Sequence, residues 1–157
     1  IMKKFLLFAL ILCMTSCIVN SDEPCTCTPG TSSKTITIKV KASDWQYSDQ
    51  GNNNYFYVGA DVPEITEHVF DKGEVKAYLV KDRYNSYYAR KHALPYVMHK
   101  EEFVNQLNDW VFYTETIDFT YGIGWIELNF RASDFAYELG VNPNFQDMEF
   151  DIVITRP

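Results

Sequence analysis

The sequence predicts an all-β domain, an antiparallel β-sandwich of the immunoglobulin-like or a related kind with one or two short helical turns. Six or seven short segments between positions 36 and 154 alternate apolar and polar residues, as half-buried strands do. Aromatic residues make up 16% of the chain, with 11 Tyr and 11 Phe, and this composition favours strands. Because each strand has one polar face, two sheets packed on a shared core are the simplest arrangement, and a closed barrel is the alternative.

The first strands follow from strict alternation. Ile36, Ile38, Val40 and Ala42 alternate with Thr and Lys, which predicts a half-buried strand at residues 36–42. The polar residues 49–54 lack the ligand spacing of a calcium loop, so a turn is the favoured interpretation. Residues 55–60 are expected to form the next strand.

The middle of the domain contains a short helical piece and two more strands. Pro63 opens a turn or short helix that ends at Gly73, because proline is favoured in the first helical turn and glycine just after the last. Residues 75–80 alternate and predict a third strand. Residues 94–98 predict a short strand, and Pro95, which has no N–H to donate, places it at a sheet edge.

The last part of the domain contains the clearest hairpin pattern. Residues 111–121 alternate, Gly122 and Gly124 mark a turn, and residues 126–130 return with apolar side chains at the even positions. Residues 148–154 alternate in the same way and predict the closing strand.

Two further helical segments are expected. Phe103, Val104 and Leu107 have helical spacing, which predicts a short helix at about residues 100–108. Residues 133–140 have the pattern of a capped helical turn.

The chain starts with the segment order of a bacterial lipoprotein signal peptide. Lys3 and Lys4 precede an apolar run over residues 5–14, and Thr and Ser then precede Cys17. The run is shorter than the about 20 apolar residues of a spanning helix, and an ordinary secretory signal has no need of a cysteine at this position. We therefore expect residues 1–16 to be removed and Cys17 to carry acyl chains that hold the protein on a membrane.

Residues 17–33 comprise the lipidated cysteine and a linker rich in Asp, Glu, Pro, Gly, Ser and Thr. Within the linker, Ser-Asp-Glu at residues 21–23 resembles the short acidic export signal of Bacteroidetes lipoproteins carried to the outer face of the outer membrane. The expected location is the cell envelope, as an outer-membrane lipoprotein, with surface exposure favoured over a periplasm-facing orientation. Residues 34–157 are expected to form the single sandwich domain.

The charge of the exported chain argues against one class of partner. Removal of residues 1–16 takes away two lysines and no acidic residue, so the formal charge at pH 7 goes from −7 to −9. An acidic domain is repelled by phosphate backbones. We therefore expect no nucleic-acid partner.

Catalytic and metal-binding motifs are missing from the sequence. His68, His92 and His99 do not have the spacing of metal ligands, and no Gly-x-Ser-x-Gly motif occurs. Glu115 and Glu127 have the chemistry of a glycosidase pair, but the alternation places them on different faces of the hairpin. We predict no catalytic residue, metal, cofactor or enzymatic activity. The alternative function is that of a small carbohydrate-active enzyme or a glycan-binding accessory protein.

Residues 83–92 have the composition of a binding loop, because they are basic and rich in tyrosine within an acidic protein. Tyrosine combines a flat ring with a polar hydroxyl, a chemistry used by loops that bind sugars or proteins. A glycan or an envelope protein is the expected ligand, and the alternative is a simple hairpin end. The candidate ligand-binding residues are Tyr84, Tyr87, Tyr88, Arg83, Arg90 and Lys91.

Residues 61–66, 73–78, 94–96 and 148–154 resemble segments of a group of Bacteroidetes cell-envelope lipoproteins of no established activity. Many members of that group carry collagen-like Gly-Pro repeats between the lipid and a C-terminal β-domain, and this chain lacks the repeat. The resemblance covers about residues 35–157. It implies a lipid-anchored β-domain and carries over no functional residue. The expected function is therefore that of a surface binding or structural module.

Overall fold

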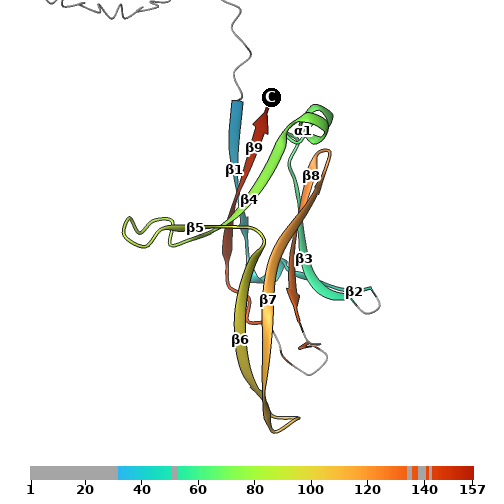
Figure 1. Ribbon diagram of the computed structural model, residues 1–157, viewed down its shortest axis with the longest axis vertical. Helices are drawn as coiled ribbons and strands as arrows, with labels where there is room; N and C mark the ends of the chain where they lie inside the picture. Colours follow the sequence, from blue (N-terminus) through green and yellow to red (C-terminus); the bar gives the residue numbers. More distant parts are fainter. Residues whose placement is uncertain (1–31, 51–52, 134–135, 138–140, 142) are drawn as a thin grey trace, which may run out of the picture.

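The computed structural model describes residues 32–50, 53–133, 136–137, 141 and 143–157. Within these residues, nine strands form two antiparallel sheets with the strand orders β1-β9-β4-β5 and β2-β3-β8-β7-β6 (Figure 1). The strands are β1 (Ser32–Val40), β2 (Gln46–Gln50), β3 (Asn53–Asp61), β4 (Glu74–Lys81), β5 (Arg90–Ala93), β6 (Tyr96–Val104), β7 (Asp109–Gly122), β8 (Trp125–Ala132) and β9 (Met148–Arg156). Both sheets contribute to one buried cluster, which confirms the predicted all-β sandwich.

The four-stranded sheet is built around β9, which pairs with β1 on one side and β4 on the other. The even-numbered side chains of β9 face the core, and Ile152 lies between Ile36 of β1 and Ala77 of β4. The predicted strands at residues 36–42, 75–80 and 148–154 are thereby confirmed, although the first one ends at Val40 before a short 3-10 turn (Ala42–Asp44).

The five-stranded sheet is built around the β7–β8 hairpin. Ile117 lies opposite Phe130, and both side chains are buried against the other sheet. Two residues, Ile123 and Gly124, connect the paired ends of the strands. Gly124 has a φ of 84°, a conformation that residues with a Cβ rarely adopt, so the predicted glycine turn is confirmed.

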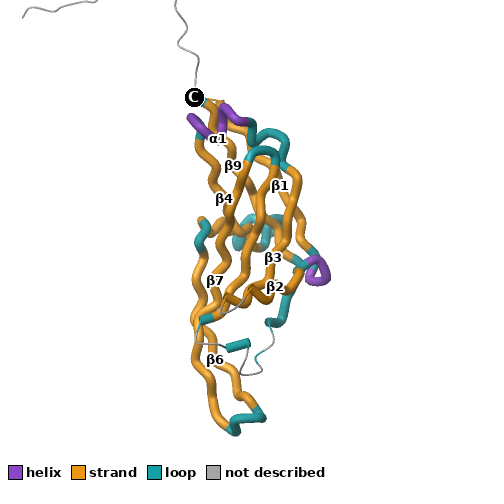
Figure 2. Tube along the Cα trace, turned by 90° about the vertical axis from the view of Figure 1, so that its right-hand side faces the viewer, coloured by secondary structure: helices purple, strands orange, loops and turns teal. Residues whose placement is uncertain are grey.

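One end of the sandwich is closed by the segment that leads into helix α1 (Glu67–Lys72). Thr66 caps the helix by accepting a hydrogen bond from the backbone N–H of Val69 at 3.3 Å. Gly124 of the β7–β8 turn accepts from Val62 and donates to Ile65, both at 2.8 Å. The start of β1 and the C-terminus lie at this same end (Figures 1 and 2).

The predicted helix at residues 100–108 is wrong. Strand β6 continues to Val104 and pairs with β7 over its whole length, so that Phe103 lies opposite Trp110. The turn follows at residues 105–108, where Asn108 has a φ of 50°. The hydrogen bonds of a long strand pair outweigh the weak helical spacing of three apolar residues. The strand predicted at residues 94–98 begins only at Tyr96, so Pro95 lies between β5 and β6 and outside both strands; β6 is an outer strand, as expected.

Two other segments differ from the expectation or fall outside the structure. Strand β2 was not expected, because residues 46–50 are almost entirely polar; it is an edge strand that pairs with β3. Strand β5 was not expected either: the loop predicted at residues 83–92 ends before Arg90, where the chain pairs with β4. The helical turn predicted at residues 133–140 lies mostly outside the described residues, as do residues 51–52 of the predicted polar turn.

Candidate functional site

The tyrosine-rich loop connects β4 to β5 at the edge of the four-stranded sheet and projects sideways from the sandwich (Figure 1). Tyr84, Tyr87 and Tyr88 are 83%, 92% and 59% exposed. No other described large hydrophobic residue is as exposed as Tyr84 or Tyr87. The structure therefore brings the three predicted tyrosines together on one protruding loop.

Asn85 organises the backbone of this loop. Its carbonyl accepts hydrogen bonds from Tyr88 and Ala89 at 3.0 and 2.8 Å, and its N–H donates to the carbonyl of Asp82 at 2.8 Å. The side-chain oxygen of Asn85 also accepts from the N–H of Tyr87 at 3.2 Å. This turn chemistry is typical of asparagine and gives the tyrosines a defined backbone.

The base of the loop is held on the outer face of the sheet by Asp151 of β9. Lys91 and Thr37 lie 2.8 Å from the Asp151 carboxylate, and Arg83 donates to it as well. Arg83 also pairs with Glu149. We call these groups the Asp151 network; with them, the Asp151 side chain is only 1% exposed.

The Asp151 network stabilises the ionised carboxylate. Burial by itself would raise the pKa of Asp151, but the hydrogen bonds from Lys91, Arg83 and Thr37 outweigh burial and lower the pKa to about 2. The hydrogen bond from Arg83 likewise lowers the pKa of Glu149. Asp151 is therefore charged at every physiological pH.

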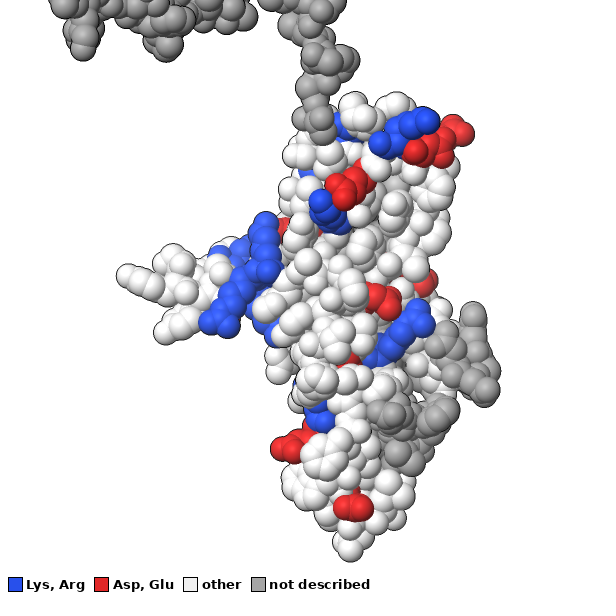
Figure 3. All heavy atoms as spheres, viewed as in Figure 1, with Lys and Arg blue, Asp and Glu red and all other residues white. Residues whose placement is uncertain are grey.

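This network changes the role of the predicted basic residues. Arg83 and Lys91 are paired with carboxylates of the sheet, whereas Arg90 forms no ion pair with any residue that the structure describes. Figure 3 shows basic side chains gathered at the foot of the projecting loop. Two of the predicted basic residues thus hold the loop on the sheet, and only Arg90 has its charge available for a ligand.

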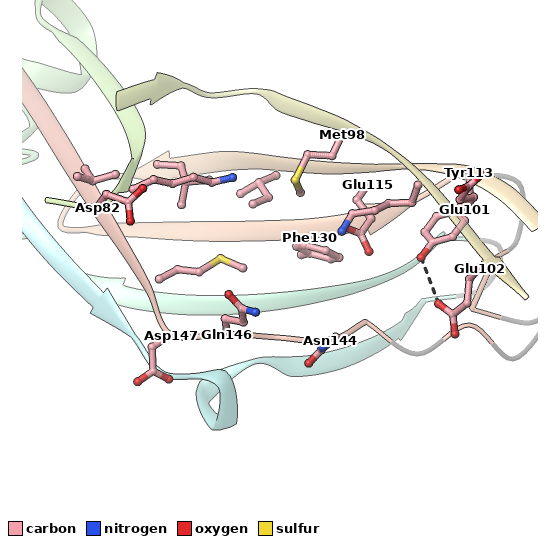
Figure 4. A pocket seen from close by; sticks show the side chains of 16 residues that line it. Asp82, Met98, Glu101, Glu102, Tyr113, Glu115, Phe130, Asn144, Gln146 and Asp147 are labelled. Atoms are coloured by element: carbon pink, nitrogen blue, oxygen red, sulfur yellow. Dashed lines mark hydrogen bonds and ion pairs between the residues drawn. The ribbon is translucent and has the colours of Figure 1, made fainter. Parts of the chain in front are cut away.

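A second site lies between the two sheets and was not predicted from the sequence. It is a pocket of about 590 Å³ (Figure 4). The C-terminal end of β4, the strands β6, β7 and β8, and the segment that leads into β9 line it. Its apolar lining residues include Leu79, Met98, Ile117, Phe130 and Met148. Its charged lining residues are Asp82, Glu101, Glu102, Glu115, Asp147, Lys81 and Lys100.

Glu115 is the most buried charged residue of this pocket, at 5% exposure. Its side chain lies on the core face of β7, because Glu115 shares that face with Tyr113 and Ile117. The ammonium group of Lys100 lies 3.3 Å from the carboxylate. No hydrogen bond to this carboxylate comes from the residues that the structure describes.

Two tyrosines lie in the electrostatic field of this carboxylate. Burial, together with the charges of Glu115 and Glu102, raises the pKa of Tyr113 to about 12. The Tyr113 hydroxyl lies 3.5 Å from Glu102. Burial and the charge of Glu115 also raise the pKa of Tyr137. Both hydroxyls stay protonated, as expected beside negative charge in a poorly solvated site.

One sequence feature does point to the pocket. In the alternating pattern of β7, the odd-numbered residues from 111 to 117 face the core, and Glu115 is the carboxylate among them. Its supposed glycosidase partner, Glu127, pairs with Thr120 on the outer face of the sheet, so the predicted placement on different faces is confirmed.

The other candidate residues are scattered. No group of three or more His, Cys, Asp or Glu side chains suited to a metal ion occurs in the described part of the chain. His92 packs against the ring of Tyr96, with 4.5 Å between the ring centroids. Cys17 lies outside the described residues.

Comparisons with known proteins add no assignment. No family model, curated protein or solved structure matches the chain. Across the residues that the structure describes, no helix has the length and apolar character needed to cross a membrane.

Proposed function

We propose that this protein is a lipid-anchored binding module of the cell envelope, and that the tyrosine loop is its ligand contact. The observation that carries the proposal is the exposure of Tyr84, Tyr87 and Tyr88 on a loop held at its base by the Asp151 network. Rigid aromatic rings provide contact area at a low cost in side-chain entropy. Three of them on one protrusion form the kind of surface that a partner covers.

The chemistry of the loop favours a ligand with hydroxyl groups and some negative charge, such as an envelope glycan. Tyrosine rings stack on sugar faces, and their hydroxyl groups donate hydrogen bonds. Arg90 adds a cation that has no ion-pair partner among the described residues. Because Arg83 and Lys91 are already paired, ring contacts carry most of the proposed affinity, and added salt is expected to weaken binding only slightly.

The geometry is compatible with a tether at one end of the domain. Ser32, where the described chain begins, lies at the end closed by α1, while the tyrosine loop projects from the side of the sandwich (Figures 1 and 2). An anchor on Cys17, followed by the linker, leaves the loop open to the surroundings. The enzymatic alternative receives no support from Glu115 and Glu127, which lie on opposite faces of one sheet.

Replacing the three loop tyrosines is expected to weaken ligand binding about tenfold or more, since each aromatic contact contributes about 0.5–1.5 kcal/mol. The measurement is a binding screen of envelope glycans and envelope proteins with wild type and Tyr84→Ala/Tyr87→Ala/Tyr88→Ala. A Trp110→Ala/Phe112→Ala variant is the control, because it removes exposed aromatic rings from a different surface. A ligand that loses affinity with the control variant, and keeps it with the loop variant, would move the contact to β7.

We expect Cys17 to be the cysteine that is acylated, and Cys13 not to be needed for acylation. Cells fed radiolabelled palmitate are expected to label wild type and Cys13→Ser, and to leave Cys17→Ser unlabelled, because the thiol of Cys17 is the proposed acceptor. Label in Cys17→Ser, or none in wild type, would contradict the anchor while leaving the loop proposal open.

A further inference from the structure

The pocket between the sheets combines an apolar wall with an excess of carboxylates. Leu79, Met98 and Met148 supply apolar surface, and Phe130 supplies an aromatic ring. Five carboxylates and two ammonium groups also line the pocket, which gives it a net negative charge. Clefts lined by one sign of charge with low-dielectric walls concentrate ions of the opposite sign.

The two lysines offset only part of this charge. The ammonium group of Lys81 lies over the ring of Tyr96, 5.0 Å from its centroid, and Lys100 is the described ion-pair partner of Glu115. Glu101, Glu102, Asp82 and Asp147 form no ion pair with any residue in the described part of the chain. Burial is the main cause of the raised pKa of Tyr113, and the charges of Glu115 and Glu102 add to it.

The Glu115 carboxylate points into this pocket near Phe130 (Figure 4). A carboxylate so buried normally accepts several hydrogen bonds. Here its one described partner is the Lys100 ammonium group at 3.3 Å, and the Lys100 side chain is 43% exposed. The carboxylate therefore retains hydrogen-bond acceptor positions that a donor entering the pocket can fill.

We propose that this pocket binds a small organic cation that carries an ammonium or guanidinium group on an apolar body. The cationic group donates charge-assisted hydrogen bonds to Glu115, and the apolar body packs against Met98, Met148 and Phe130. The volume of about 590 Å³ lies within the range of small-molecule sites. Asp82 lines this site and also accepts a hydrogen bond from Asn85 of the tyrosine loop. Neither proposal depends on the other, because Glu115 lies on β7 and the tyrosines lie on the β4–β5 connection.

Three probes of matched shape and different charge test the proposal. They are 2-phenylethylammonium, neutral 2-phenylethanol and anionic 3-phenylpropanoate, each titrated into the full chain in zwitterionic lipid nanodiscs. The readout is the ¹³C-methyl NMR signals of Met98 and Met148, which line the pocket from opposite sheets. We expect the ammonium probe to shift both signals and to bind about tenfold more tightly than the alcohol, and the carboxylate to leave both signals unchanged.

The Glu115→Gln variant is expected to lose the preference for the cation, so that the ammonium probe and the alcohol bind within about threefold of each other. Glu127→Gln is the matched control, because it removes the same charge from the outer face of the same sheet. We expect it to retain the preference. If Glu115→Gln does not fold, a Glu101→Gln/Glu102→Gln variant at the pocket replaces it in the test. This variant is expected to lower the affinity for the ammonium probe and to leave the affinity for the alcohol unchanged.

Several results would overturn the cation site. These are equal affinity for the ammonium probe and the alcohol, tighter binding of the anion, unchanged Met98 and Met148 signals with all three probes, or an equal loss in Glu115→Gln and Glu127→Gln. The last result would assign the preference to the overall negative charge of the protein.

Discussion

The Ile152→Ala variant is expected to lose about 2–5 kcal/mol of unfolding free energy. Ile152 is fully buried in the central strand of the four-stranded sheet, between Ile36 and Ala77, and faces the second sheet. Truncation removes apolar burial and leaves a cavity that strands paired on both sides cannot close. The measurement is urea unfolding followed by tryptophan fluorescence.

Val153→Ala is the matched control for this core prediction, because Val153 is the next residue of β9, lies on the outer face and is only partly buried. Its expected cost is about 1 kcal/mol or less. Equal losses in the two variants would mean that β9 does not present its even-numbered side chains to the core.

The Asp151→Asn variant is expected to lose about 2 kcal/mol of unfolding free energy at pH 7. Asp151 is buried, and its pKa falls from an ordinary value of 3.8 to about 2 in the folded protein. A pKa that is lower in the folded state by this amount corresponds to about 2 kcal/mol of stability from the ionised carboxylate. The asparagine side chain also replaces one carboxylate oxygen with an NH2 group. This NH2 group is a donor and cannot accept the hydrogen bond that Lys91 or Arg83 donates to the carboxylate.

The stabilisation from Asp151 is expected to vanish in acid. The folded state binds the proton of this carboxylate less tightly than the unfolded chain does, so the contribution is complete above about pH 4–5 and is lost as the pH falls towards 2. The difference between wild type and Asp151→Asn should therefore shrink across this window. Comparing the two proteins by urea unfolding at several pH values isolates Asp151 from the other carboxylates.

Asp118→Asn is the control for the Asp151 prediction, because it removes a carboxylate that lies 3.4 Å from Arg131 on the outer face, with both side chains about one third exposed. The expected loss of unfolding free energy in Asp118→Asn is less than about 1 kcal/mol, because an ion pair exposed to solvent contributes little to stability. A wild-type advantage over Asp151→Asn that persists unchanged at pH 2 would show that packing, and not charge, explains the loss.

The tyrosine loop was predictable in composition and exposure, but the role of its charges was not. Tyrosines clustered between two alternating segments predict an exposed connection, and the structure places them there. Arg83 pairs with Glu149 and Asp151, which lie more than 60 residues later in the chain. Alternation placed Asp151 on the polar face of its strand, yet Arg83, Lys91 and Thr37 cover it almost completely.

The pocket was harder to predict because its lining residues come from both sheets. The alternation of β7 predicts that the Glu115 carboxylate faces the core. The facing side chains of Met98, Phe130 and Met148 belong to three other parts of the chain, and no local pattern brings them together. A carboxylate at a core-facing position of a strand pattern thus indicates a cavity. It does not indicate the shape of the cavity or its ligand.

The amino-acid pattern alone predicted which residues form most strands and which side chains face the core, because strand alternation depends on residues two positions apart. It also determined the β7–β8 turn, where only a glycine accepts the backbone conformation without strain. The pattern did not reveal the strand order, the extension of β6 to Val104, the Asp151 network or the pocket. Each of these depends on segments distant in sequence that meet after folding, where hydrogen bonding and burial outweigh local preference.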